Sequence, residues 1–347
     1  ITGSGDVTAT TTTGSAIGVY AFAFDQYGAI TIDVSGDVTA ETTGAGNAIG
    51  IRAYSYAGDV YVTSSGEITA SNVTGSAIGI LTGRFGYSTV DNSGDITTTT
   101  SAGNSIGIQV DSFYGAYINN SGDLTASTMY GSARGIQALT TYDVTVINSG
   151  DITASSYATG SAQGIRAKSA NGYASVTNSG DISASSTYTN AISILATGLY
   201  GVEVINSGNL SADTDFSIGY GIYAETRFGD ATVSSSGDIT AHSTDLTSAG
   251  IYAKAGYNAS INNSGVISAT SDYANAYGAY AYGLVGVAAI FNTGDVSVSA
   301  NYDSTGLFAK SLYDVAYINN PGDVSVSSEY GTAAYGIYAS AFGSTAV

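Results

Sequence analysis

Hydrophobic and polar positions alternate along the whole chain in a pattern that returns every 28 to 31 residues. The clearest copies are NSGDLTAS at Asn120 to Ser127, NSGDITAS at Asn148 to Ser155 and NSGDISAS at Asn178 to Ser185. A marker glycine recurs in twelve copies, at Gly5, Gly36, Gly66, Gly94, Gly122, Gly150, Gly180, Gly208, Gly237, Gly265, Gly294 and Gly322. Such a period is typical of a solenoid, in which each repeat forms one coil and stacks on its neighbours.

Each repeat contains three segments with the alternation of a half-buried strand. The first segment follows the marker glycine, as Ile152 and Ala154 do with a hydroxyl residue between them, and the second is typified by SAQGIRA at Ser161 to Ala167. The third segment leads to the next marker glycine, as DVTVINSGD at Asp143 to Asp151 does in the repeat before. Successive side chains of a strand point to opposite faces, so the constant aliphatic positions face inward and the variable ones outward. We see no helical periodicity.

Three strands and three corners per repeat predict an all-β chain folded as a right-handed three-sided parallel β-helix of about twelve coils. The β-solenoid is expected to run continuously over residues 1–347 as one domain without evident capping coils. At about 4.8 Å per coil, the rod would be about 58 Å long.

Asparagine recurs two residues before the marker glycine. The column contains Asn92, Asn120, Asn148, Asn178, Asn206, Asn263, Asn292 and Asn320. These residues are expected to stack as an amide ladder at one corner. The marker glycine is expected to supply a positive φ there.

Composition narrows the possible functions. The chain has 27 Asp and Glu against 8 Lys and Arg, and its net charge of −19 disfavours nucleic acid and anionic membrane surfaces. Without cysteine it has no disulfide or thiolate metal site. No apolar run approaches the roughly 20 residues needed to span a bilayer, and the opening ITGSGDVTA is not a secretion leader. Any export signal or anchor is expected outside this segment.

The two ends of the sequence are compatible with each other. If Val347 is placed before Ile1, then Ala346, Val347 and Ile1 match the inward, outward and inward register of Ala231 to Val233. The segment is then either a window of a longer repeat region or a subunit whose last strand is completed by the next copy, through strand addition at a sheet edge. Both alternatives predict a long fibre or stalk; a monomer whose capping coils lie outside the segment is the third.

The alternation of NSGDITA with SAxGI over all twelve repeats resembles the passenger regions of bacterial autotransporters and related large surface adhesins. The resemblance implies a right-handed β-helix outside the cell. It reports architecture rather than a particular activity, and the chain contains neither a C-terminal membrane barrel nor an inserted functional domain.

An acidic residue follows the marker glycine in ten copies, including Asp95, Asp123, Asp151 and Asp181. Stacked carboxylates repel one another, and Ca²⁺ would relieve that repulsion. The alternative is that each carboxylate accepts hydrogen bonds from turn amides or serine hydroxyls. We expect no cofactor, and keep calcium as the weaker alternative because Val266 interrupts the column.

Few residues suggest catalysis, and we predict a non-enzymatic protein without catalytic residues. The single histidine, His242, is expected in a loop. Arg134, Arg166 and Lys168 lie in consecutive second segments, as a small basic patch or as charge balance for the stacked carboxylates.

Tyrosine is the most distinctive surface feature, with 28 copies. Tyr223, Tyr252, Tyr280 and Tyr338 fall in the second segment of the later repeats and are expected to form an exposed contact surface. They would stack on sugars or pack against a neighbouring filament, unless they are ordinary strand-forming residues.

These observations predict a secreted structural protein that forms an extracellular fibre, sheath or adhesive stalk. Its expected partner is itself, in a head-to-tail filament or a lateral bundle, with carbohydrate or a host surface as further partners. The alternative function is a carbohydrate-binding or polysaccharide-cleaving β-helix, which would require a local departure from the repeat.

Overall fold

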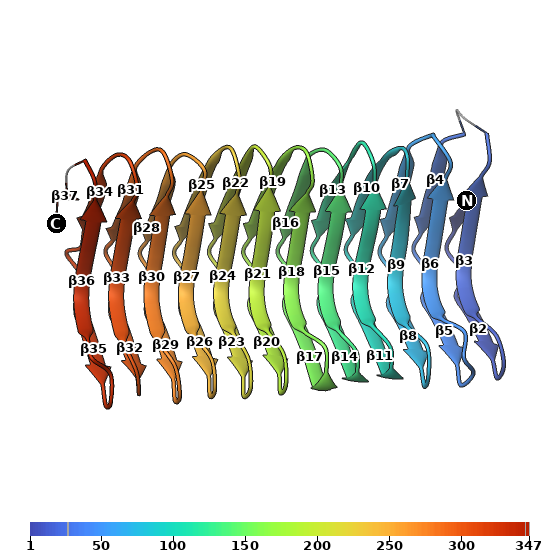
Figure 1. Ribbon diagram of the computed structural model, residues 1–347. Helices are drawn as coiled ribbons and strands as arrows, with labels where there is room; N and C mark the ends of the chain where they lie inside the picture. Colours follow the sequence, from blue (N-terminus) through green and yellow to red (C-terminus); the bar gives the residue numbers. More distant parts are fainter. Residues whose placement is uncertain (26–27, 344, 347) are drawn as a thin grey trace.

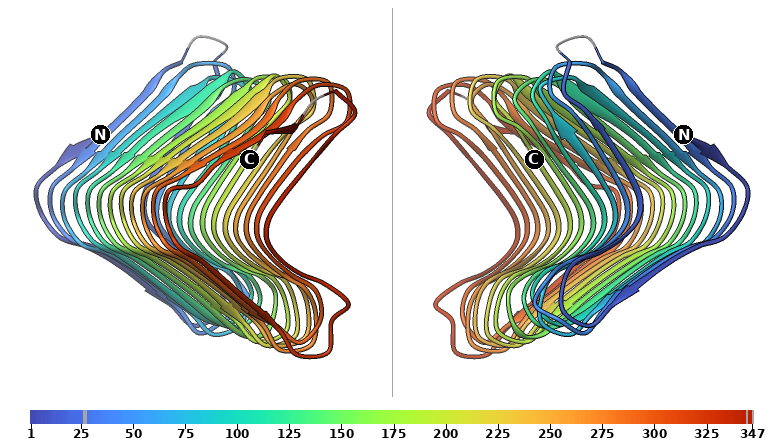
Figure 2. Two further views of the ribbon diagram at one scale, coloured as in Figure 1. Left: turned by 90° about the vertical axis from the view of Figure 1, so that its left-hand side faces the viewer. Right: turned by 90° about the vertical axis from the view of Figure 1, so that its right-hand side faces the viewer.

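The computed structural model describes residues 1–25, 28–343, 345 and 346, and in it the chain winds into a β-solenoid of twelve coils (Figure 1). All regular elements among these residues are strands, and none is a helix that could cross a membrane. Viewed from either end, the chain advances in a right-handed sense (Figure 2). The predicted right-handed, three-sided parallel β-helix is therefore confirmed.

The strands form three parallel sheets, named sheets 1, 2 and 3 in the order in which each coil visits them. Sheet 1 follows the marker glycines and contains β2 (Val7–Thr11), β5 (Val38–Thr42), β8 (Ile68–Asn72), β11 (Ile96–Ala102), β14 (Leu124–Tyr130), β17 (Ile152–Thr159), β20 (Ile182–Ser186), β23 (Leu210–Thr214), β26 (Ile239–Ser243), β29 (Ile267–Ser271), β32 (Val296–Ala300) and β35 (Val324–Ser328).

Sheet 2 contains the longest strands. They are β3 (Ala16–Ala23), β6 (Ala48–Ser55), β9 (Ala77–Arg84), β12 (Ser105–Ser112), β15 (Ala133–Thr140), β18 (Ala162–Ser169), β21 (Ala191–Gly198), β24 (Gly219–Thr226), β27 (Ser248–Ala255), β30 (Ala276–Gly283), β33 (Ser304–Ser311) and β36 (Ala334–Ala341).

Sheet 3 leads back to the marker glycines. It contains β1 (Thr2–Gly3), β4 (Ile30–Val34), β7 (Val60–Ser64), β10 (Tyr87–Asn92), β13 (Gly115–Asn120), β16 (Val144–Asn148), β19 (Tyr173–Asn178), β22 (Gly201–Asn206), β25 (Asp230–Ser235), β28 (Ala259–Asn263), β31 (Ala288–Asn292), β34 (Ala316–Asn319) and β37 (Thr345–Ala346).

Equivalent residues of successive coils pair in register, so each inward position becomes a column along the rod. Ile152 pairs with Leu124 on one side and Ile182 on the other, and all three are at most 2 % exposed. The aliphatic columns of the three sheets meet in one hydrophobic cluster that extends through the stack. Each coil therefore buries its apolar face largely against its neighbours.

Sheet 2 is bent inward, and the cross-section of the rod is a chevron (Figure 2). The bend lies at the third residue of each strand, where the pairing between strands skips one position; this residue is glycine, such as Gly164 of β18, in every strand except β21, which has Ser193. A Cβ atom on Gly164 would lie 2.1 Å from Cγ2 of Ile182, which belongs to sheet 1 of the next coil. Glycine is required here because it lets the two sheets approach this closely.

The marker glycines have a different role from the one predicted. Among the described residues, positive φ angles at glycine occur only at Gly83, Gly103, Gly115 and Gly160, so the expectation of a positive φ at the markers was wrong. A Cβ atom on Gly150 would instead lie 2.1 Å from the carbonyl oxygen of Gly122 in the preceding coil. Close stacking of backbone at this corner, rather than a left-handed turn, excludes a side chain.

The asparagine column lies buried at the corner between sheets 3 and 1. From Asn92 to Asn206, each Nδ2 except the last donates to Oδ1 of the next asparagine at 2.8 Å. The same nitrogen donates to the carbonyl oxygen of the marker glycine two residues later, as Asn148 does to Gly150 at 2.6 Å. A second run joins Asn263, Asn292 and Asn320. The ladder thus links consecutive coils and closes each corner.

Ser235 interrupts the ladder. Its Oγ accepts a hydrogen bond from Nδ2 of Asn206 at 3.1 Å, while the buried Oδ1 of Asn263 beyond it has no hydrogen-bond partner. We expect Ser235→Asn to join the two runs and stabilise the protein by about 1 kcal/mol, since one more buried hydrogen bond is formed and one orphan acceptor is satisfied. Urea unfolding followed by circular dichroism measures the change; a lower midpoint would contradict it.

Candidate functional site

The outer face of sheet 2 is the concave face of the chevron, and three columns of side chains line it. They stand one residue before, two residues after and four residues after the bend glycine, as Gln163, Arg166 and Lys168 do around Gly164. The first column changes along the rod from the apolar cluster of Ile49, Ile78 and Ile106, through Arg134 and Gln163, to a stretch in which tyrosines alternate with smaller residues. The face is therefore the most varied surface of an otherwise regular rod.

The second column becomes an aromatic ladder in the later coils. The ring centroids of Tyr223, Tyr252, Tyr280, Phe308 and Tyr338 are 4.7 to 5.1 Å apart, and neighbouring rings are inclined by only 3 to 16°. Each ring covers the face of the next. The rings are consequently half-buried, and their edges and hydroxyl groups, rather than their faces, are presented to a partner.

This geometry bears on the two contacts predicted for the tyrosines. A sugar stacks on the face of an aromatic ring, and within the ladder those faces are occupied by neighbouring rings. Packing against a protein surface through ring edges and hydroxyl groups remains compatible with the arrangement. Burial raises the pKa of Tyr280 to about 12, and it raises the pKa of the flanking Tyr220 to about 12 as well. These hydroxyl groups are neutral hydrogen-bond donors at physiological pH.

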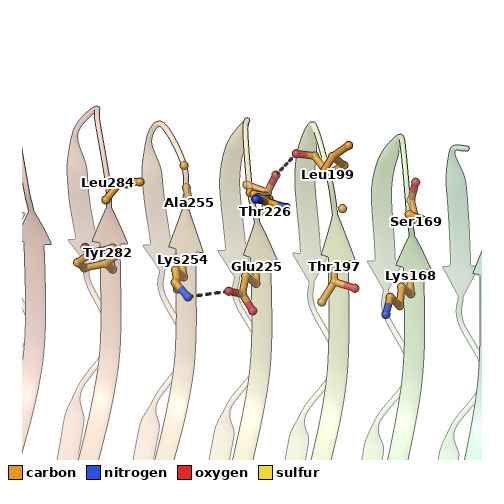
Figure 3. A pocket seen from close by; sticks show the side chains of 14 residues that line it. Lys168, Ser169, Thr197, Leu199, Glu225, Thr226, Lys254, Ala255, Tyr282 and Leu284 are labelled. Atoms are coloured by element: carbon orange, nitrogen blue, oxygen red, sulfur yellow. Dashed lines mark hydrogen bonds and ion pairs between the residues drawn. The ribbon is translucent and has the colours of Figure 1, made fainter. Parts of the chain in front are cut away.

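A hollow of about 690 Å³ lies on the concave face over β18, β21, β24, β27 and β30 (Figure 3). Lys168, Arg227 and Lys254 contribute positive charge to it, and Nζ of Lys254 donates to Oε1 of Glu225 at 2.7 Å. Burial disfavours the charged form of Glu225, but hydrogen bonds from Lys254 and Tyr223 outweigh it and lower the pKa of this carboxyl. The hollow thus retains cationic groups beyond its internal ion pair.

Basic residues are confined to this side of the rod. The eight are Arg52, Arg84, Arg134, Arg166, Lys168, Arg227, Lys254 and Lys310. Seven lie in strands of sheet 2, and Arg227 directly follows β24. The strands of sheet 2 together hold only two acids, Asp111 and Glu225. Within the described part of the chain, Lys254 is the only Lys or Arg in a salt bridge with a carboxylate.

The predicted basic trio lies at the centre of the concave face. Arg134 of β15 donates from Nε to Oε1 of Gln163 at 3.0 Å, and Arg166 and Lys168 follow in β18. Burial, and then the nearby charge of Arg166, lowers the pKa of Arg134 to about 10, which leaves it protonated at neutral pH. The stacked acids lie at the opposite corner, between sheets 3 and 1, and among the described residues none of them forms a salt bridge with the trio.

The acidic column forms that opposite corner, between sheets 3 and 1. Its exposed members are Asp6, Asp37, Glu67, Asp95, Asp123, Asp151, Asp181, Asp238, Asp295 and Asp323. Asp123 accepts the backbone amide of Asp151 on Oδ1 at 2.8 Å, and Asp151 accepts that of Asp181 at 2.8 Å. A side chain is not needed on the donor, so Val266 fits at this position by donating its amide to Asp238.

Eight of the ten carboxylates accept a backbone amide of the next coil in this way, a structural task that requires no metal. Among residues 1–25, 28–343, 345 and 346, the structure places no three His, Cys, Asp or Glu side chains where they could share a metal ion. Calcium binding by Asp95, Asp123, Asp151 and Asp181 stays a prediction.

His242 lies in β26 rather than in the expected loop. Its Nδ1 is 2.8 Å from Oγ1 of Thr270, and its Nε2 is 4.0 Å from Oδ1 of Asp213. These partners occupy the same outward column of sheet 1 in the adjacent coils. The histidine is one member of a stacked surface column.

The backbone differs from the expected register at the C-terminal end, whereas Ile1 lies opposite Ile32, in the inward column of Val233 as predicted. Thr345 and Ala346 pair with Ala316 and Tyr317. Ala346 therefore belongs to the outward column of Tyr317, whereas the sequence predicted that it would belong to the inward column. Spacing does not fix this register, because the connection from sheet 2 to sheet 3 varies in length between coils. At the other end, β1 pairs with the last residues of β4, and the Ile1 carbonyl accepts from the Asp33 amide. Val347 lies outside the described residues.

Sequence reasoning missed two rows of exposed aromatic residues at the rims of the concave face. Tyr56, Phe85, Phe113 and Tyr142 form contacts along the corner between sheets 2 and 3, with ring centroids 5.6 to 5.9 Å apart. Tyr157, Tyr188, Phe216, Tyr273 and Tyr302 are exposed at the corner between sheets 1 and 2. The signal was a large apolar residue in nearly every connecting segment.

Comparison with known proteins identifies no relative: no protein-family model, curated protein or solved structure matches this chain.

Proposed function

We propose that the protein is a non-enzymatic structural element that forms an extracellular fibre, sheath or adhesive stalk through the stacking of its coils. The observation that supports this most directly is the openness of the stack at its end coils. Val324 and Ile337 are only half-buried, whereas Val296 and Leu307, their equivalents one coil earlier, are at most 1 % exposed. Further coils, of the same chain or of another copy, would bury these residues and pair the free strand edges.

The uniformity of the rod agrees with this role. Strand pairing continues through sheet 1 from β2 to β35 with one register shift, between Thr128 and Tyr130 of β14, and no inserted domain interrupts the coils in the described part of the chain. The sequence resemblance to autotransporter passengers and surface adhesins also favours a position outside the cell. Carbohydrate binding remains the second candidate because of the cationic hollow on the concave face. The ring faces of the aromatic ladder are covered by neighbouring rings, however, which disfavours stacking of sugars on them.

Electron microscopy of the purified chain at increasing concentration tests the proposal. We expect rods much longer than the about 58 Å of twelve coils, with an axial spacing near 4.8 Å in diffraction. Removing the half-buried apolar side chains of the last coil, in Val324→Ser with Ile337→Ser, should shorten the rods; Ser325→Ala, at an outward position of the same strand, is the matched control. Particles that stay at the length of one chain at every concentration would contradict the proposal.

A further inference from the structure

The concave face and the acidic corner are complementary in shape. Viewed from the end, sheets 3 and 1 meet in a projecting corner on one side of the chevron, and sheet 2 forms a hollow on the other (Figure 2). Both features run along the whole rod. The backbone outline therefore allows the corner of one rod to face the concave face of a second, parallel rod that is related to it by translation.

Their charges are complementary as well. The ten exposed acids of the corner stand against the seven basic residues in the strands of sheet 2, which hold only Asp111 and Glu225 as acids. The bordering connections add Arg227, but they also hold acids, such as Asp59 and Asp143. Eight of the acids already accept a backbone amide on Oδ1, which holds the carboxylate in place. Of these eight, Asp181 also accepts from Asn209 on Oδ2. Opposed rows of fixed charge of this kind select a partner and its orientation.

The spacing of the two surfaces also agrees. Corner and concave face belong to the same coils, so both repeat once per coil, at about 4.8 Å. Between parallel rods, each coil of one therefore meets a coil of the other, and the seven coils that carry a basic residue in or directly after sheet 2 can lie against the column of corner acids. The exposed aromatic rims would lie over the hydroxyl-bearing outer faces of sheets 1 and 3 of the inserted rod, where tyrosine offers contact area with a polar tip.

We propose that the concave face binds the acidic corner of a second copy of this chain, so that rods nest side by side. The interface joins two different surfaces, so each copy keeps one surface free and the association is open-ended. It rests on the proposed structural function and specifies how fibres become bundles or sheets. An acidic polysaccharide is the competing occupant of the same basic face.

Two variants, each with the charges of one surface replaced by neutral side chains, test the corner and the concave face separately. The corner variant replaces the nine corner aspartates by Asn and Glu67 by Gln; Asn209, whose Oδ1 accepts the amide of Asp238 at 3.1 Å, demonstrates that Asn preserves the backbone bond. The groove variant replaces Arg52, Arg134, Arg166, Lys168 and Lys310 on the concave face by Gln, which already occupies positions equivalent to the three arginines at Gln109, Gln137 and Gln163. Circular dichroism verifies that both variants fold.

Analytical ultracentrifugation at about 0.15 M salt, where the screening length is about 8 Å, provides the readout. We expect the wild type to associate laterally with increasing concentration and each variant alone to associate at least about tenfold more weakly. The corner variant is decisive, because its net charge falls from −19 to −9 (−19 + 10), which lessens repulsion between copies. If repulsion between net charges alone governed association, the corner variant would associate more strongly than the wild type, and that result would overturn nesting.

Mixing the two variants in equal amounts is expected to restore association that ends at pairs. The groove variant supplies an intact corner and the corner variant supplies an intact concave face, while the other surface of each variant carries the substitutions. Growth beyond pairs, or no recovery, would overturn the nesting geometry.

Electron microscopy distinguishes this inference from the proposed function. If both variants form single long rods and only the wild type forms bundles, the result supports the fibre proposal and the nesting proposal together. Long wild-type rods that never bundle overturn nesting and leave the fibre intact. Binding of polygalacturonate by the wild type but not by the groove variant, without association of copies, would assign the face to an acidic polysaccharide and overturn nesting as well.

Discussion

Gly164→Ser is expected to destabilise the solenoid by about 3 kcal/mol, the upper range for overpacking a close-packed core. A Cβ atom at this position would lie 2.1 Å from Cγ2 of Ile182 and 2.6 Å from the carbonyl oxygen of Ser193. Both obstacles belong to the next coil, so the substitution forces two coils apart and affects all three sheets at that point.

The chain itself contains the compensating change. At the equivalent bend position of the next coil the residue is Ser193, and the aliphatic side chain that faces it is Leu210, which lacks a γ2 methyl group. Ser193 is fully buried and its Oγ donates to the carbonyl oxygen of Ser211 at 2.8 Å. Serine is therefore accommodated where leucine replaces isoleucine.

We accordingly expect Gly164→Ser combined with Ile182→Leu to recover more than half of the loss. Ile182→Leu alone is a volume-conserving change and should cost less than about 1.5 kcal/mol. Chemical denaturation of the four proteins gives a double-mutant cycle with a favourable coupling. If the double variant is no more stable than Gly164→Ser, the γ2 methyl group is not the obstacle.

Asn148→Ala is expected to cost about 3 to 5 kcal/mol, because three buried hydrogen bonds disappear together and leave orphan groups. Asn148 accepts from Asn120, donates to Asn178 and donates to the carbonyl oxygen of Gly150. In the alanine variant, Nδ2 of Asn120, Oδ1 of Asn178 and the carbonyl oxygen of Gly150 each lose their hydrogen bond to Asn148. Asn148 is only about 1 % exposed, so water does not readily replace these bonds.

Asn119→Ala is the matched control. Asn119 precedes a ladder residue in β13, but its side chain points outward and makes one long hydrogen bond of 3.3 Å to Asp91. Its loss should change the free energy of unfolding by about 0.5 kcal/mol or less. Equal destabilisation by the two substitutions in urea unfolding would mean that the ladder makes no special contribution.

The sequence alone determined the architecture. Because the coils stack in register, residues at equal positions of the repeat lie above one another, and a period of 28 to 31 residues with three alternating segments left little freedom for another fold. The asparagine column followed from the same reasoning, as did the inward aliphatic columns. These features depend on which residues recur, and recurrence can be read directly from the chain.

The tertiary structure decided what depends on contacts between different sheets. The role of the marker glycines comes from the carbonyl group of the preceding coil, and the inward bend of sheet 2 comes from its approach to Ile182 and its equivalents. That bend gathers the dispersed basic residues on one concave face, opposite the acids. The stacking of the tyrosine rings on one another follows from side-chain rotation, which spacing does not specify. Local periodicity thus fixed the coil and the positions of its residues, whereas the cross-section, and with it the candidate binding face, arose from packing between sheets.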